Sequence, residues 1–230
     1  MWNDKNKAIT FSFDDGCRRD VDLIKVLDKY ALKATFNLNS ALLGTHFVRD
    51  DNYKISPCEV AGLYRGHEVA AHTLSHPTLT LLPDDKTIVY QVEQDRLDLE
   101  KLCGKKVVGF AYPGNGDGEV TDRRVAEILR RDTGVKYARV PISSYSFDLP
   151  ADLYSLKPTV HIVDKKLFDI AERFLALKAE GPQLFYIWGH GFELDNGDGF
   201  DLSVFDRFCA LVSGKTDIFY GTNYEVLLDI

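Results

Sequence analysis

The feature of this chain that most restricts its fold is a regular alternation of short apolar runs, rich in β-forming residues, with stretches of helical periodicity. Strands separated by helices run parallel, because a parallel pair needs a long crossover connection. The sequence therefore predicts a parallel sheet with outer helices, either closed as a (β/α) barrel or open as a doubly wound sheet. We expect strands over residues 8–13, 34–38, 68–71, 107–112, 136–140, 155–162, 183–188 and 217–220, and helices over 20–30, 84–103, 121–131, 165–178 and 202–212, with a further helix starting at Ser56 and a short one at the C-terminus.

Composition limits the classes of protein that remain. The 230 residues contain no linker, low-complexity segment or repeat, so we expect one domain over residues 1–230. With 45% hydrophobic and 27% charged residues, the chain has material for a large core and is neither disordered nor a coiled coil. A net charge of -7 argues against nucleic acid or an anionic membrane as a partner.

The ends and the cysteines of the chain suggest its compartment. No apolar run approaches the ~20 residues that span a bilayer, and residues 1–5 are polar, so we expect a cytoplasmic protein without a signal peptide. The four cysteines are widely spaced, which predicts free thiols rather than a disulfide framework or a cysteine zinc site.

Chemically useful side chains stand where the expected strands end. Parallel strands all end at one face, and this is the face on which barrel enzymes carry their active sites. We therefore expect these side chains to converge. They are Asp14 and Asp15 after the first strand, His72 and His76 after the third, Tyr112 after the fourth, Arg139 at the end of the fifth, His161 at the end of the sixth and His190 after the seventh.

Among these residues, two histidines and an adjacent pair of aspartates have the composition of a metal site. We expect His72 and His76, four residues apart, to share one side of a helical turn and to reach one ion. Asp14 and Asp15 repel each other unless a cation lies nearby. Two histidines and one aspartate would leave an open position for water on a divalent ion; Zn²⁺ fits these ligand types best, and Co²⁺, Ni²⁺ or Mn²⁺ are compatible. The simpler alternatives are hydrogen-bonded histidines and an Asp-Gly turn.

At these residues the chain resembles the polysaccharide deacetylases of the NodB-homology type, carbohydrate esterase family 4. Residues 11–16, FSFDDG, are similar to the first motif of that family, (T/S)FDDG, and residues 72–76, HTLSH, match its second motif, H(S/T)xxH. Residues 112–115, YPGN, resemble a weakened third motif, RxPxG, and residues 187–190, IWGH, resemble the fifth, a strand that ends in an isolated histidine. The order and separations agree with the family from about residue 7 to residue 192.

The resemblance implies a fold, a cofactor and a set of roles. The fold is a deformed (β/α) barrel of about seven parallel strands with outer helices. One divalent ion would be held by Asp15, His72 and His76, with Asp14 as the general base and His190 as the general acid. The backbone N–H of Gly114 would stabilise the oxyanion, and Tyr112, Pro113, Gly114 and Trp188 would line the substrate site.

The chain also departs from the family pattern. Ala111 stands where the third motif has an arginine that pairs with the base, and we expect Arg139 to contact Asp14 in its place; the alternative is an Arg139 that faces solvent. Gly114 and Asn115 replace the usual aromatic residue and glycine, which opens the wall of the pocket. No tryptophan-containing fourth motif is evident. The carboxylate that orients His190 could come from residues 146–150, SFDLP. His161 could also orient His190 or line the site, although a structural histidine is the stronger expectation. Glu193 either tunes His190 or faces solvent.

These observations favour metal-dependent hydrolysis of an N-acetyl or O-acetyl group on a carbohydrate. A second hypothesis keeps the machinery and changes the substrate to a small amide, as in an amidase or a deformylase. Phosphoryl transfer through Asp14 and a non-catalytic carbohydrate-binding protein are further alternatives. The expected partner is an acetylated saccharide or a small amide, and the sequence leaves the oligomeric state open.

Overall fold

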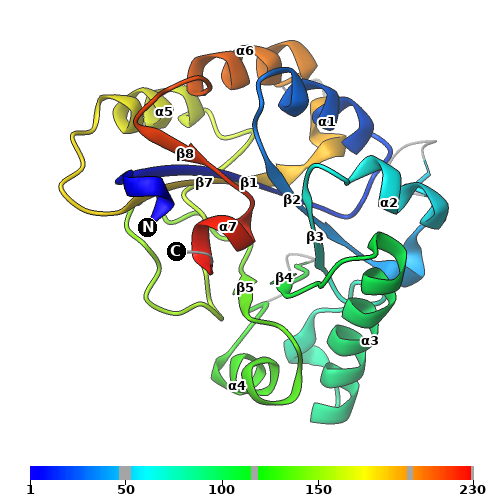
Figure 1. The fold of residues 1–230 in the computed structure, drawn as a ribbon. Coiled ribbons are helices and arrows are strands. Elements are labelled where there is room, and N and C mark those ends of the chain that lie inside the picture. Colours follow the sequence, from blue (N-terminus) through cyan, green and yellow to red (C-terminus); the bar gives the residue numbers. More distant parts are fainter. Residues whose placement is uncertain (47–52, 115–118, 196–198, 229–230) are drawn as a thin grey trace.

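The computed structural model describes residues 1–46, 53–114, 119–195 and 199–228. Figure 1 shows a curved sheet with helices on its outside. The strands are β1 (Lys7–Asp14), β2 (Ala34–Leu38), β3 (Glu68–Ala71), β4 (Gly109–Ala111), β5 (Tyr137–Arg139), β6 (Val160–His161), β7 (Gln183–His190) and β8 (Ile218–Tyr220). The helices are α1 (Asp20–Lys29), α2 (Val60–Leu63), α3 (Asp85–Cys103), α4 (Arg123–Asp132), α5 (Leu167–Ala176), α6 (Leu202–Val212) and α7 (Asn223–Leu227).

The sheet is parallel throughout and has the order β5-β4-β3-β2-β1-β7-β6. β7 pairs with β1 along its whole length, whereas β2 pairs with Phe11–Asp14 and β8 with Lys7–Ile9. β8 therefore occupies the part of the β1 edge that β2 leaves open. The predicted deformed barrel of about seven parallel strands with outer helices is confirmed, with β8 as an added short strand.

The barrel is most irregular between β5 and β6, which are the two edge strands of the sheet. The strand expected over residues 155–162 is wrong in its length, because only Val160–His161 pairs with β7. Leu156 pairs instead with Arg139 of β5. Pro158 lies between the two pairings, and a proline cannot donate to a strand ladder. The segment thus passes from one edge of the sheet to the other and completes the wall of the barrel without a continuous strand.

The two faces of β1 serve different environments. Ile9, Phe11 and Phe13 belong to the large core between sheet and helices, and the Phe11 ring lies 6.3 and 6.2 Å from the rings of Phe205 and Phe208 on α6. Because successive side chains of a strand point to opposite faces, Thr10, Ser12 and Asp14 point into the barrel. The interior is apolar at the amino-terminal end, where Trp2, Tyr137, Leu184, Tyr186 and Val226 form a second cluster, and polar at the other end.

Local sequence signals fix the helix ends. Asp84 caps α3 by accepting a hydrogen bond from the Thr87 N–H, and Gly104 ends the helix in the left-handed conformation, in agreement with the helix expected over residues 84–103. The helix expected from residue 121 begins slightly later, at Arg123, because the carboxylate of Asp122 caps α4 by accepting the Val125 N–H. The four cysteines are unpaired, as predicted. None of the described helices is long and apolar enough to cross a membrane.

Candidate active site and metal centre

The predicted site residues converge at the carboxyl-terminal ends of the strands. The register places Asp14 beside Asn37 of β2 on one side and His190 of β7 on the other. A cavity of about 570 Å³ opens above them. Of the predicted residues, its lining includes Asp14, His72, His76, Tyr112, Gly114, Trp188 and His190. Asp15, Pro113 and Arg139 are buried and lie outside that lining.

Asp14 is a buried carboxylate held from two sides. Its Oδ1 accepts a hydrogen bond from Asn37 Nδ2 at 2.8 Å and another from Arg139 Nη2. The predicted contact between Arg139 and Asp14 is therefore confirmed, although it is made by one nitrogen to one oxygen and not by a two-bonded fork. Burial raises the pKa of Asp14, but the charge and the hydrogen bond of Arg139, together with the interaction with His190, outweigh this effect and keep the pKa below its usual range.

Arg139 is fully buried, and its guanidinium lies 5.1 Å from the centre of the Trp188 ring. Asn37 was not predicted, although its place in β2 offered a signal. A polar residue inside an otherwise apolar run, next to the strand that carries Asp14, is expected to face the site.

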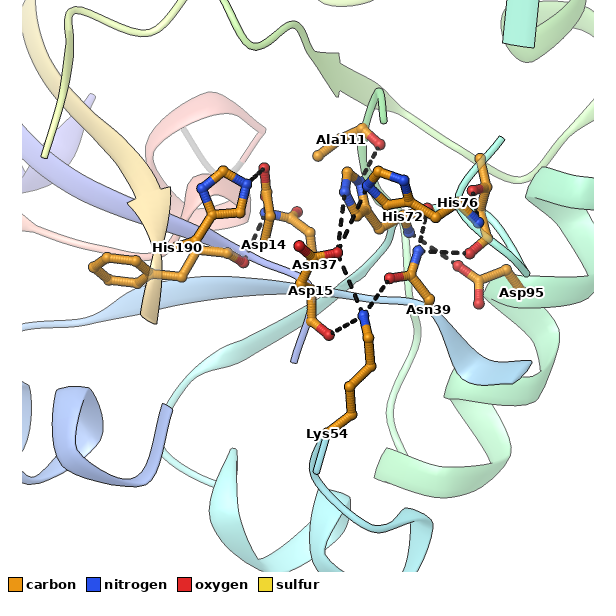
Figure 2. Close-up of polar contacts among 12 residues, drawn as sticks. Asp14, Asp15, Asn37, Asn39, Lys54, His72, His76, Asp95, Ala111 and His190 are labelled. Carbon is orange, nitrogen blue, oxygen red and sulfur yellow. Dashed lines mark hydrogen bonds and ion pairs between the residues drawn. The ribbon is translucent and has the colours of Figure 1, made fainter. Parts of the chain in front are cut away.

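Asp15, His72 and His76 lie together, with their candidate ligand atoms all within 4.8 Å of one another. Asp15 Oδ1 is 3.6 Å from His76 Nε2 and 4.0 Å from His72 Nε2 (Figure 2). The expected helical turn is wrong, because Thr73 and His76 both have a positive φ, of 65° and 63°. The loop nevertheless brings the two imidazole centres to 4.8 Å.

The tautomer of His72 is set by a backbone group. Its Nδ1 lies 2.8 Å from the carbonyl oxygen of Ala111. A carbonyl only accepts, so Nδ1 carries the proton and the lone pair of Nε2 faces Asp15. Burial lowers the pKa of His72 to about 4, which keeps the ring neutral. Ala111, at the position where the family resemblance expects an arginine, thus contributes its backbone.

Two polar residues hold the histidine loop. Asp95 of α3 accepts a hydrogen bond from the His72 N–H at 2.9 Å, and Asn39 Nδ2 donates to the carbonyl oxygens of His72 and Thr73 at 2.6 and 3.0 Å. Burial raises the pKa of Asp95 to about 7. Its position was readable, because it falls on the buried stripe of α3 and an acidic residue there needs hydrogen-bond donors.

Lys54 is a further neighbour of Asp15 that the sequence did not indicate. Its Nζ donates to the backbone oxygen of Asp15 at 2.8 Å and to Asn39 Oδ1 at 3.1 Å, and it lies 3.4 Å from Asp15 Oδ1 (Figure 2). Burial raises the pKa of Asp15, while Lys54 and the histidines lower it, with a net value of about 2.

His190 lies on the opposite side of Asp14 from His72 and His76 (Figure 2). Its Nε2 is 3.9 Å from Asp14 Oδ2, and its Nδ1 is 3.3 Å from Glu193 Oε1. The expectation that residues 146–150 supply the orienting carboxylate is wrong. Asp148 pairs with Gln183, at the other end of β7. Glu193, on the 3₁₀ helix Gly191–Asp195, is the neighbouring carboxylate because that helix turns back against the end of the strand.

The wall formed by the third motif is described only in part. Tyr112 lines the cavity, and its hydroxyl donates to the Tyr154 carbonyl at 2.9 Å. Gly114 is exposed at the cavity. Asn115 lies outside the described residues. Trp188 lines the cavity with most of its ring buried, and its Nε1 donates to Ser143 Oγ at 3.2 Å.

The fold and the site define a deformed parallel (β/α) barrel with a cavity, lined by aspartate and histidine side chains as well as apolar ones, at the carboxyl ends of its strands. A sequence model of the polysaccharide deacetylase family matches residues 2–148, and the chain belongs to that family. No curated protein matches the chain.

Solved structures share the fold at low sequence identity. The peptidoglycan deacetylase PdaC from Bacillus subtilis is 20% identical with a TM-score of 0.56, and the match covers 96% of this chain and 90% of that one. A family 4 carbohydrate esterase from Streptomyces lividans, in complex with acetate, is 18% identical with a TM-score of 0.55, covering 94% and 93%. BA3943 from Bacillus anthracis, a pseudoenzyme of the same family, is 16% identical with a TM-score of 0.59, covering 96% and 66%.

Proposed function

We propose that this protein is a metal-dependent hydrolase that removes an acetyl group from an acetylated carbohydrate. The observation that carries the proposal is the position of Asp14. It is an ionised, buried carboxylate that lies between the cluster of Asp15, His72 and His76 on one side and His190 on the other. Binding alone would need neither a base nor an acid at these two positions.

The residues present fit a divalent ion. Asp15 offers a carboxylate oxygen, and His72 offers the lone pair of a neutral imidazole whose other nitrogen is hydrogen-bonded to a backbone carbonyl. With His76 they make the three-ligand set that leaves a position open for water or substrate. We infer that Asp15, His72 and His76 hold the ion, with Zn²⁺ the best match to the ligand types. When bound, such an ion lowers the pKa of a water from 15.7 to about 7 and polarises the acyl carbonyl.

Asp14 would act as the general base. Arg139 and Asn37 hold its Oδ1, which leaves Oδ2 to accept the proton of the attacking water. Its lowered pKa keeps the carboxylate ionised at neutral pH. A base that is fixed in one rotamer meets its water at hydrogen-bond distance in every encounter, which is the condition for efficient proton transfer.

His190 would act as the general acid for the leaving amine or alkoxide. Burial lowers its pKa, but the charges of Glu193, Asp14 and Asp15 outweigh that effect and raise it. A larger fraction of His190 is therefore protonated at neutral pH than in a solvated histidine. The backbone N–H of Gly114, at the cavity wall, is the expected donor to the oxyanion.

Acetate release tests the proposal directly. The purified protein, supplied in turn with Zn²⁺, Co²⁺, Ni²⁺ and Mn²⁺, is incubated with N-acetylated oligosaccharides, O-acetylated oligosaccharides, formamides and ring amides. We expect metal-dependent acetate release from a saccharide and none from Asp14→Asn. Turnover of only the formamides or ring amides would support the alternative, a small-amide hydrolase, and turnover of none of them would refute the proposal.

A further inference from the structure

Glu193 lies between two histidines of neighbouring strands. Its Oε1 is 3.3 Å from His190 Nδ1 at the end of β7 and 3.2 Å from His161 Nε2 at the end of β6. Its other oxygen, Oε2, accepts a hydrogen bond from the backbone N–H of His190 at 2.8 Å. Two imidazoles thus converge on a single carboxylate oxygen, on the side of His190 that faces away from Asp14.

The protonation state of this cluster follows from its backbone contacts. The Val163 N–H donates to His161 Nδ1 at 3.4 Å, so Nδ1 of His161 is an acceptor and the proton of the neutral ring is on Nε2, toward Glu193. The pKa of Glu193 is about 2, because its contacts with His161 and His190 outweigh the effect of burial, and the carboxylate is therefore an acceptor only. Nδ1 of His190 is buried and makes no hydrogen bond of ordinary geometry within the described part of the chain, so Glu193 Oε1, at 3.3 Å, is the acceptor that lies within ion-pair distance of it.

The Glu193 carboxylate packs closely against the backbone at the end of β7. A Cβ atom at Gly189 would lie 2.3 Å from Ile162 Cγ2 and 2.9 Å from Glu193 Oε2, so the glycine is what lets Glu193 lie against the end of β7. The His161 ring packs edge-on against Trp188, with centroids 4.3 Å apart, and the guanidinium of Arg139 lies over the Trp188 ring, 5.1 Å from its centre. His161 therefore contacts Glu193, which lies beside His190. It also contacts Trp188, which packs against Arg139, the partner of Asp14.

We propose that Glu193 and His161 are positioning residues for His190 and act as one unit. Glu193 accepts the Nδ1–H of His190 and thereby directs its Nε2 toward the cavity as the proton donor. His161 donates its Nε2–H to the same oxygen of Glu193 and fixes the carboxylate between the two rings. This inference rests on the proposed function, since it assigns the partners of the general acid.

Glu193, His161 and His190 also have the composition of a second metal site. If they bound an ion, the His161 nitrogen that faces Glu193 would have to be unprotonated, which is the opposite of what our proposal requires. A metal ligand must present a lone pair, whereas the hydrogen bond from Val163 places the proton of His161 on the nitrogen that faces Glu193. The protein should therefore bind one divalent ion per chain, and that ion should be lost with His72→Ala and retained with His161→Phe.

Four variants test the unit. Glu193→Gln keeps the shape and removes the charge. His161→Phe keeps the ring against Trp188 and removes the N–H, and His161→Gln restores an N–H donor. Glu172→Gln, on the exposed face of α5, is the matched control for the loss of a carboxylate. The readouts are kcat and KM for acetate release, metal content, and the ¹⁵N chemical shifts of the His190 ring, which report its tautomer without any turnover.

We expect Glu193→Gln to lower kcat about 10–100-fold, with KM within about twofold, because an outer partner of a site histidine is lost. His161→Phe should lower kcat by a smaller factor, His161→Gln should recover most of the loss, and Glu172→Gln should match the parent. In the parent, His190 should carry its proton on Nδ1. An unprotonated Nδ1, an unchanged kcat in Glu193→Gln, or two metal ions per chain would overturn the proposal.

The outcomes separate this proposal from the function on which it rests. Acetate release that is insensitive to Glu193→Gln would refute the positioning unit and leave the deacetylase proposal intact. A His190 that carries its proton on Nδ1 only while Glu193 and His161 are present, in a protein that hydrolyses none of the substrates, would refute the function and support the unit.

Discussion

Two clusters of the same composition flank Asp14, each with two histidines and one carboxylate. In one, Asp15 faces His72 and His76, and in the other, Glu193 faces His161 and His190. Their protonation differs because their backbone contacts differ. The Ala111 carbonyl takes the proton of His72 and leaves a lone pair toward Asp15, whereas the Val163 N–H occupies the lone pair of His161 and leaves a proton toward Glu193.

The comparison teaches that residue types alone do not define a metal site. One backbone carbonyl, or one backbone N–H, on the far side of an imidazole decides whether its near side can bind a cation or donate a proton. The electrostatic surroundings agree with this division. His72 is neutral because burial lowers its pKa to about 4, and the pKa of His190 is raised by its acidic neighbours.

The largest expected effect is the loss of bound metal when the cluster of Asp15, His72 and His76 is altered. His72→Ala and His76→Ala each remove one of the three proposed ligands, and we expect bound metal to fall from one ion per chain to none detectable by elemental analysis, with loss of activity. His46→Ala, which removes an exposed histidine, is the control and should retain the ion. Full metal content in both ligand variants would show that the ion is not held by the cluster of Asp15, His72 and His76.

Substitution of Asp14 should separate the base from the ligands. Asp14→Asn keeps the side-chain shape but cannot accept the proton, so we expect metal content to be unchanged and kcat to fall about 10²–10⁴-fold in steady-state assays. Asp15→Asn should instead lose the metal. If Asp14→Asn loses the ion and Asp15→Asn keeps it, the two roles are reversed.

Removal of Arg139 should lower both the catalytic efficiency of Asp14 as the base and the stability of the fold. Arg139→Ala leaves Asp14 buried without its main partner, which typically costs about 3–5 kcal/mol. We expect a lower midpoint of urea unfolding in the metal-free protein, together with a marked fall in kcat while the loaded protein retains its metal. Arg139→Lys should recover part of the stability, because a buried cation is restored. An Arg139→Ala protein with parental stability and kcat would contradict the role.

The smallest expected effect is a displacement of the pH profile. The groups that face His190 are Asp14 and Asp15 on one side and Glu193 on the other, with His161 beyond Glu193. Since these acids raise the pKa of His190, kcat/KM should stay high above pH 6.5 and fall as the pH rises through that pKa. Glu193→Gln removes one negative charge and should move this fall to lower pH, so that the variant loses more activity at pH 8 than at pH 6. A basic limb that does not move would contradict the pairing of Glu193 with His190.

Much of the architecture was readable from the sequence because it depends on local patterns. The bounds of β2, β3 and α6 agree with the predicted ranges, since each is a short apolar or amphipathic run with clear ends. The positions of Asp14, His72 and His190 at strand ends followed from the same alternation, as parallel strands bring their carboxyl ends to one face. The contact between Arg139 and Asp14 was also predictable, because the two residues end strands of one sheet.

The partners of these residues, in contrast, were decided only by the tertiary structure. Lys54 reaches Asp15 from a segment whose position cannot be read from local sequence, and the left-handed φ of Thr73 and His76 replaced an expected helical turn. The carboxylate beside His190 proved to be Glu193 and not Asp148, because the chain turns back in a 3₁₀ helix directly after β7. Periodicity fixes which side of a strand or helix a residue occupies. Hydrogen-bond partners depend instead on the distances between segments that are far apart in the chain, and these distances are set only when the barrel forms.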